Sequence, residues 1–379
     1  MVPPDGKALL GFIPDWRDTP QGLNGRLVAA GGLAPGALGM FVHTPMRDSD
    51  RHAIQGFMER AMGAIVVVTA EPFEFDAFNA SDAEELAGFC QRFEEYGGSA
   101  CIIRFMHEMN GGWYPWCQKP SLFKEKFRLM ATKLYQVTRR SGMVWSVNGG
   151  DGYPFLGGQY TAKPSDPWYH ELDTNGDGKV TLEDDMYEPF YPGDDVVDWV
   201  GITLYHWGDA WPWGENDVPE NNVFVKKLRG NYVGYGGDAR AVPDFYARYC
   251  EGSRKKPLML TETAALYVEG APFGGKGSEM EIRRNWWKQV YGIHRCEPSV
   301  LCGGDLPQLK MINWFDIVKE EAAVDGNVAK WGFTQDTIMT RQFVQDVLGS
   351  TWAQLRYVGL NYVYYMKDQL ISQQSAESR

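Results

Sequence analysis

Residues 100–116 read ACIIRFMHEMNGGWYPW, an apolar run that passes into a segment rich in glycine and aromatic residues. The apolar part is continuous rather than alternating, which is typical of a parallel strand buried on both faces. Similar runs recur elsewhere, so that the chain contains eight candidate strands. They are Ala8–Ile13, Met40–His43, Ala64–Thr69, Ala100–Phe105, Met143–Val147, Val197–Tyr205, Leu258–Thr261 and Met311–Trp314.

Amphipathic segments with helix start signals lie between several of these runs. Ser81–Glu84 reads as a capping box before a helix at Glu85–Tyr96. Ser278–Glu281 reads as another before a helix at Ile282–Arg295, and a third helix is expected over 122–140. Strands and helices therefore alternate, which predicts a single (β/α)8 barrel with long loops; a doubly wound sheet is the alternative.

The domain organisation predicted from this alternation is simple. We expect one barrel domain over residues 1–371, with an insertion at 173–184, because 379 residues suit one large α/β domain. The polar segment 372–379 is expected to be a frayed tail.

Charge excludes several classes of partner. The chain carries 37 Lys and Arg against 49 Asp and Glu, a formal net charge of −12, which repels phosphate backbones and anionic lipid. No apolar run reaches the roughly 18 residues of a membrane-spanning helix. We therefore expect a monomer with no nucleic acid or membrane partner. It is expected to be extracellular or periplasmic, its signal preceding this sequence, with a cytoplasmic protein as the alternative.

The six cysteines include no CxxC pair, which argues against a zinc ribbon or a thioredoxin-type site. Their even number allows disulfides, with Cys296 and Cys302 as the nearest pair. Buried free thiols are the alternative.

Two glutamates stand where a barrel places its chemistry, at the carboxyl ends of strands. Glu108 follows the fourth run and Glu262 ends the seventh. Two carboxyl groups facing each other among indole rings suit glycosidic bond cleavage, in which one protonates the leaving oxygen and the other attacks the anomeric carbon. The alternative is that each is a structural ion-pair partner. A zinc-protease motif is excluded because its second histidine would fall at Gly111.

Trp113, Tyr114 and Trp116 follow a Gly-Gly pair and surround a proline, which indicates a loop. Aromatic side chains on such a loop can stack on the apolar faces of sugar rings. Packing in the core is the alternative for each of them.

These segments together resemble glycoside hydrolase family 26. Arg104–Trp116, with His107 directly before the glutamate, is similar to the family's acid/base segment. Leu258–Thr263 resembles its nucleophile strand, Trp199–Trp207 its sixth strand and Trp145–Asn148 the end of its fifth strand.

The resemblance implies roles for particular residues. Glu108 would be the acid/base and Glu262 the nucleophile of a retaining, double-displacement glycosidase. Tyr205 would hydrogen-bond Glu262 and keep it charged and oriented, and burial among tryptophans would raise the pKa of Glu108. The residues expected to bind substrate are Arg104, His107, Trp113, Trp116, Tyr205 and Trp314, with Trp113 and Trp314 as stacking platforms.

The substrate that the resemblance implies is a plant or algal β-linked polysaccharide, foremost β-1,4-mannan cleaved by an endo-acting mannanase. Mixed-linkage β-1,3-1,4-glucanase and β-1,3-xylanase activities are alternatives within the family. Phe105 stands where many members have proline, and Ala264 and Ala265 where many have glycine, which leaves the subtype open. A carbohydrate-binding protein without catalysis is the alternative of another class. A metal-dependent hydrolase is disfavoured because the histidines are scattered.

A second motif, Asp173–Asp184, matches a calcium loop. Oxygen ligands are expected from Asp173, Asn175, Asp177, the backbone carbonyl of Lys179, and Asp184 at the twelfth position, where glutamate is usual. The motif predicts a structural calcium ion that rigidifies the connection between the fifth and sixth strands, and no cofactor for catalysis. A solvated acidic turn is the alternative.

Overall fold

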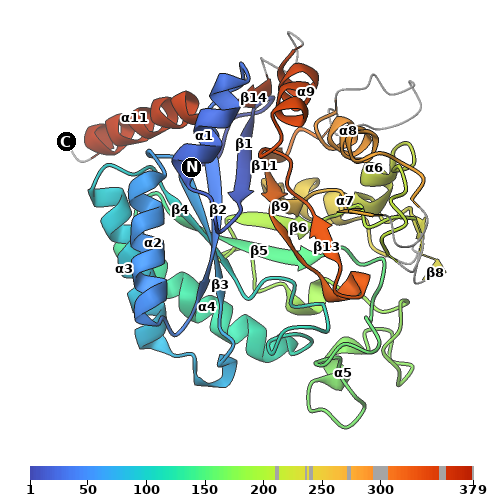
Figure 1. The fold of residues 1–379 in the computed structure, drawn as a ribbon. Helices are drawn as coiled ribbons and strands as arrows, with labels where there is room; N and C mark the ends of the chain where they lie inside the picture. Colours follow the sequence, from blue (N-terminus) through green and yellow to red (C-terminus); the bar gives the residue numbers. More distant parts are fainter. Residues whose placement is uncertain are drawn as a thin grey trace.

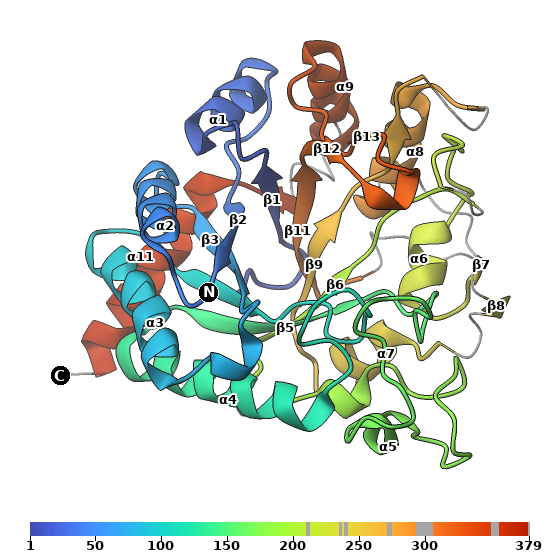
Figure 2. The ribbon, with the colours of Figure 1, turned by 60° about the horizontal axis from the view of Figure 1, so that its bottom comes forward.

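The computed structural model describes residues 1–209, 213–234, 237–238, 242–270, 275–292, 306–349 and 356–377. Eight parallel strands form a barrel (Figures 1 and 2). In order around it they are β1 (Ala8–Pro14), β2 (Ala37–His43), β3 (Ile65–Glu71), β4 (Cys101–Phe105), β5 (Gly142–Asn148), β6 (Trp199–Thr203), β9 (Leu258–Thr263) and β11 (Leu309–Asp316). The barrel closes because β1 pairs with β2 on one side and β11 on the other, which rules out the doubly wound sheet.

Helices surround the barrel in both views (Figures 1 and 2). They are α1 (Pro20–Ala29), α2 (Asp48–Arg60), α3 (Ala80–Glu95), α4 (Pro120–Val137), α5 (Tyr169–Leu172), α6 (Val223–Leu228), α7 (Phe245–Cys250), α8 (Glu279–Val290), α9 (Thr337–Leu348) and α11 (Leu360–Glu377). Short 3-10 turns occur at η1 (Phe75–Ala77), η2 (Glu188–Phe190) and η5 (Ala322–Val324). No helix among the described residues is long and apolar enough to cross a membrane.

The remaining strands are short. An antiparallel sheet of β10 (Tyr267–Val268), β13 (Val328–Lys330) and β12 (Val318–Glu320) is formed by the connections that follow β9 and β11. Strands β7 (Val233–Gly234) and β8 (Gly237–Asp238) pair with each other, and β14 (Tyr357–Val358) pairs with the start of β1.

The barrel interior is apolar toward the amino-terminal ends of the strands and polar toward their carboxyl-terminal ends. The buried interior cluster comprises Leu9, Ala37, Ile65, Val67, Ile102, Val144, Trp199, Met259, Met311, Val358, Val363 and Met366. Val363 and Met366 come from α11, so this helix packs on the amino-terminal end of the barrel. Because every second strand residue points inward, the next layer toward the carboxyl ends contains polar side chains such as Arg104, Ser146 and Thr203. These polar residues form the floor of the barrel mouth.

All eight predicted strands are confirmed, with one informative difference in length. Strand β3 continues two residues beyond the predicted end, to Glu71. The capping box at Ser278 is present, whereas α3 begins earlier than predicted, with Asn79 as its cap and Asp82 as the reciprocal partner. Residues 372–377, expected to be a tail, continue helix α11.

Some sequence predictions fall on other parts of the chain. Cys296, Cys302 and the predicted helix end at 293–295 lie outside the described residues. The other four cysteines, Cys90, Cys101, Cys117 and Cys250, are free and buried.

Candidate active site

Arg104 on β4 organises the floor of the mouth. Its side chain is fully buried and points into the barrel. Nε donates to Ser146 Oγ at 2.9 Å and Nη2 to Thr203 Oγ1 at 2.8 Å, while Nη1 donates to Glu262 Oε1. The neighbouring strands thus fix the guanidinium in one orientation, so that it can hold a carboxylate in place.

Glu262 reaches the mouth through an irregularity in β9. The pairing of β6 with β9 shifts register between Ile202 and Thr203, which places Glu262 opposite the inward-facing Thr203. A bulge of this kind re-aims a side chain beside an active site. The expected hydrogen bond from the Tyr205 hydroxyl to Glu262 Oε2 is present at 2.6 Å. Together with Arg104 it gives each carboxylate oxygen one fixed donor.

Glu108 lies in the segment after β4 with a positive φ of 55°, a backbone conformation that is strained for a glutamate. Its amide donates to the Ser146 carbonyl at 2.8 Å. The carboxylate accepts from Asn148 Nδ2 at 3.1 Å and from Trp113 Nε1 at 2.9 Å. Burial raises the pKa of Glu108, and the nearby charge of Glu262 raises it further against the lowering effect of Arg104.

His107, directly before Glu108, is buried and uncharged. Burial lowers the pKa of His107 well below its ordinary value, and Arg104 lowers it further. Its Nε2 lies 3.1 Å from the Tyr114 hydroxyl. The imidazole ring also contacts Phe41, with ring centroids 6.1 Å apart. His107 therefore presents a neutral ring to the mouth.

Aromatic rings continue around the mouth. Phe315 of β11 lies between Phe41 and Tyr205, with ring centroids 6.3 and 5.9 Å away. Tyr205 in turn packs against Trp331 at 4.8 Å. Trp113 is 37% exposed, so part of its side chain is accessible to a ligand while its Nε1–H is bonded to Glu108.

Two predicted substrate contacts are wrong, because Trp116 and Trp314 are fully buried. Trp116 stacks on Tyr114 with centroids 4.6 Å apart and donates from Nε1 to the His107 carbonyl. It therefore holds Tyr114 and His107 in place by packing and hydrogen bonding. Trp314 pairs in register with Phe12 and donates to the Trp331 carbonyl, on the side of the barrel that faces the helices. Its neighbour Phe315 occupies the inward position instead, because adjacent strand residues point to opposite faces.

Sequence reasoning missed a third carboxyl, Glu71 at the end of β3. Burial raises the pKa of Glu71 to about 7, with further raising by Glu262 and Glu108 and lowering by Arg104. The sequence does place Glu71 near a strand end, because it follows the third apolar run by two residues. The predicted strand ends at Thr69 and therefore leaves Glu71 out.

The predicted calcium ligands lie apart from the mouth, between β5 and β6. Both carboxylate oxygens of the buried Asp184 accept from backbone amides, including Thr174 at 2.7 Å and Thr181 at 2.7 Å. Asp173 and Asp177 likewise accept from amides of their own loop. Within the part of the chain that the structure describes, no three His, Cys, Asp or Glu side chains form a metal-binding group. Calcium binding by this loop therefore stays a prediction.

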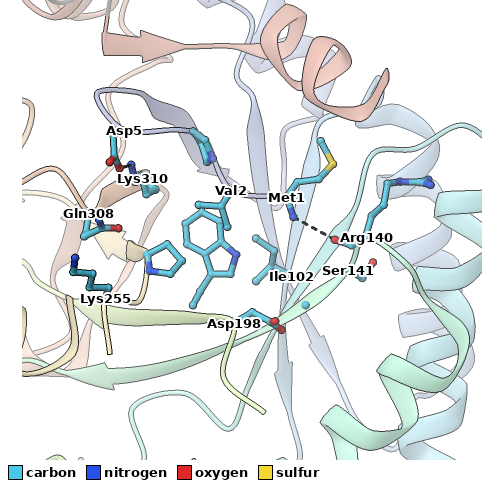
Figure 3. A pocket seen from close by; sticks show the side chains of 14 residues that line it. Met1, Val2, Asp5, Ile102, Arg140, Ser141, Asp198, Lys255, Gln308 and Lys310 are labelled. Carbon is cyan, nitrogen blue, oxygen red and sulfur yellow. Dashed lines mark hydrogen bonds and ion pairs between the residues drawn. The ribbon is translucent and has the colours of Figure 1, made fainter. Parts of the chain in front are cut away.

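A separate cavity of about 300 Å³ lies at the opposite end of the barrel (Figure 3). It is lined by the chain start at Met1 and by charged side chains that include Asp198, Lys255 and Lys310. Lys310 is buried and donates to Asp5 at 2.8 Å. Because the polar network of the mouth lies at the other end, this cavity is not the candidate active site.

Comparison with known proteins agrees with this geometry. Residues 63–169 match glycosyl hydrolase family 26, and this range contains Glu71, Arg104, His107 and Glu108. Endoglucanase H of Acetivibrio thermocellus is 25% identical over 168 residues, a match that covers 43% of this chain and 16% of that protein. The catalytic domain of a Bacillus sp. JAMB-750 GH26 endo-β-1,4-mannanase superposes with a TM-score of 0.51 at 16% identity, covering 94% of this chain and 88% of that one.

At such low identity the structural likeness shows the barrel fold alone, while the family match covers the segment that contains Arg104, His107 and Glu108. The match spans only a small part of Endoglucanase H, so that protein's activity does not transfer as a whole. The resemblance to glycosyl hydrolase family 26 that the sequence predicts is thus supported over residues 63–169.

Proposed function

We propose that this protein is a retaining endo-β-glycanase that cleaves a β-linked polysaccharide, foremost β-1,4-mannan. The observation that carries the proposal is the contrast between two glutamates at one barrel mouth. Glu262 is bonded to a guanidinium and a phenol, whereas burial raises the pKa of Glu108. Environments that differ in this way separate a nucleophile from a general acid.

The first chemical step uses both groups at once. A Glu262 oxygen attacks the anomeric carbon while the bond from that carbon to the leaving oxygen breaks. The electron pair of the broken bond goes to the leaving oxygen, which takes the proton of Glu108. Arg104 and Tyr205 orient the attacking carboxylate through their hydrogen bonds. These hydrogen bonds weaken as the carboxylate loses its negative charge in forming the bond to carbon.

The second step reverses the roles. Glu108, now ionised, takes a proton from a water molecule, and the water oxygen attacks the anomeric carbon. The bond to Glu262 breaks and its electron pair returns to the carboxylate. Two inversions at the same carbon leave the configuration of the sugar unchanged.

The choice of polysaccharide is supported by the names of similar proteins. One similar protein is named an endoglucanase and one similar structure an endo-β-1,4-mannanase, so that mixed-linkage β-glucan remains an alternative, as does β-1,3-xylan. Both names describe endo-acting enzymes. We further expect a monomer that acts outside the cytoplasm, where polymers of this size occur.

A substrate panel with product analysis tests the proposal. Purified protein is incubated with mannan, lichenan and β-1,3-xylan, and the anomeric configuration of the first products is followed by NMR. We expect new chain ends on one of these polymers, with the configuration retained. Inverted products would contradict the mechanism, and binding without cleavage would indicate a carbohydrate-binding protein instead.

A further inference from the structure

Glu71 points into the mouth because of the register of β3. Ile65 and Val67 of this strand belong to the interior cluster, so Thr69 and Glu71 face inward by the two-residue period. The pairing agrees, because Thr69 lies opposite the inward-facing Arg104. Glu71 therefore lies one layer closer to the carboxyl ends of the strands than Arg104. In the backbone pairing of β3 with β2 it lies opposite His43.

The surroundings of Glu71 are those of a carboxyl without a fixed protein partner. It is half-buried, and no hydrogen bond or ion pair of its side chain to the rest of the described chain is found. The charged groups around it are Glu262 on β9, Arg104 and Glu108 at β4, and Lys319 on β12. A partly buried carboxyl without donors is unfavourable for the folded protein, and such groups gather at binding and catalytic sites.

The barrel order places Glu71 on one side of the reacting pair. A line from β4 to β9 leaves β5 and β6 on one side, and β3, β2, β1 and β11 on the other. Glu108 is held toward the first side by Asn148 of β5 and by Trp113, whose ring contacts Phe155 at 5.0 Å. The group that protonates the leaving oxygen thus faces the β5 side, and the sugar that stays bound to the enzyme lies on the side of Glu71.

We propose that Glu71 is a specificity-determining residue that accepts hydrogen bonds from hydroxyl groups of the retained sugar. The inference rests on the proposed glycanase function. Sugar hydroxyls supply the O–H donors that Glu71 lacks in the free protein, and bonds from O–H to a carboxylate are short and strong. The residue makes no covalent bond. It selects rings whose hydroxyls point toward β3.

Kinetics of Glu71→Gln test this role. Glutamine keeps the shape but removes the charge, so we expect kcat/KM on the preferred polymer and its oligosaccharides to fall roughly 10- to 100-fold. The basic limb of the pH profile should also move to lower pH, because the repulsion between the Glu108 and Glu71 carboxylates, which raises the pKa of Glu71, acts on both groups and is lost with the charge. Glu74→Gln is the matched control: this exposed glutamate follows in the same loop, and its substitution should leave rate and profile unchanged.

The outcomes separate the two proposals. An active wild type together with a Glu71→Gln variant that keeps its kcat/KM on every polymer, and its pH profile, overturns the role of Glu71. A wild type that cleaves none of the polymers overturns the glycanase function, and calorimetric titration with β-linked oligosaccharides then tests whether Glu71→Gln weakens their binding. Should that variant not fold, Glu71→Asp replaces it, and full activity in Glu71→Asp would contradict a role that needs this reach.

Discussion

At the scale of single residues, the site separates two glutamates by what surrounds them. Glu262→Ala removes the proposed nucleophile, so we expect loss of nearly all activity on every substrate, of the order of 10⁴-fold or more. Glu108→Ala should lose as much on a polysaccharide but far less on an aryl glycoside whose leaving group needs no proton. Initial rates of both variants on both substrates provide the check. Equal losses for Glu108→Ala on the two substrates would undo the assignment of roles.

Asn148 gives a prediction about pH. Its hydrogen bond to Glu108 lowers the pKa of that carboxyl, against the larger raising effects of burial and Glu262. Asn148→Ala should therefore raise the pKa of Glu108. A general acid is active while protonated, so the basic limb of kcat/KM should move to higher pH, opposite to the shift expected for Glu71→Gln. Full pH profiles decide the matter, and a shift to lower pH would contradict it.

Glu71 also links pH to stability. The pKa of Glu71 is about 7 in the folded protein, against 4.5 as its ordinary value. The folded state thus binds the proton more tightly, and stability is lost as pH rises between these values. Glu71→Gln carries no such charge, so it should gain roughly 1–3 kcal/mol relative to wild type on going from about pH 5 to about pH 8. Urea unfolding of wild type and variant at both pH values measures this difference. A variant that gains no stability relative to wild type at the higher pH would contradict the prediction.

At the scale of elements, the strands could be predicted and their faces could not. Continuous apolar runs mark the strands because both faces of each are buried. The same continuity hides which residues face inward: Trp314 and Phe315 are both aromatic, and only the pairing of β11 with β1 shows that Phe315 faces the mouth. The register shift that turns Glu262 inward also has no signature in composition. Glu71 was missed for a simpler reason, since the apolar pattern fades before β3 ends.

The loop from Asp173 to Asp184 carries a prediction of calcium binding that rests on the sequence motif. If calcium binds the folded loop, the melting temperature should rise with added calcium and fall with chelator. Scanning calorimetry of the protein with calcium and with chelator tests this. Identical transitions under both conditions would identify the loop as a solvated acidic turn.

At the scale of the whole molecule, the barrel is sealed at its amino-terminal end by α11. Val363 of this helix is fully buried in the interior cluster. Val363→Ala should therefore destabilise the protein by about 1–3 kcal/mol through lost burial and an unfilled space. Tyr365→Ala on the exposed side of the same helix, at 56% exposure, is the control and should change stability little. Denaturant unfolding of the pair gives the answer, and equal effects would contradict the packing.

In the proposed mechanism a sugar is joined to Glu262, and the filled barrel interior beneath Arg104 blocks any approach to its anomeric carbon from inside the barrel. Any incoming molecule must arrive through the place that the departed chain end has just left. Water is small and abundant, but another carbohydrate alcohol fits that vacated place better. At high substrate concentration the protein should therefore lengthen some chains as well as shorten them. The ratio of the two products depends on whether a carbohydrate hydroxyl or water attacks first.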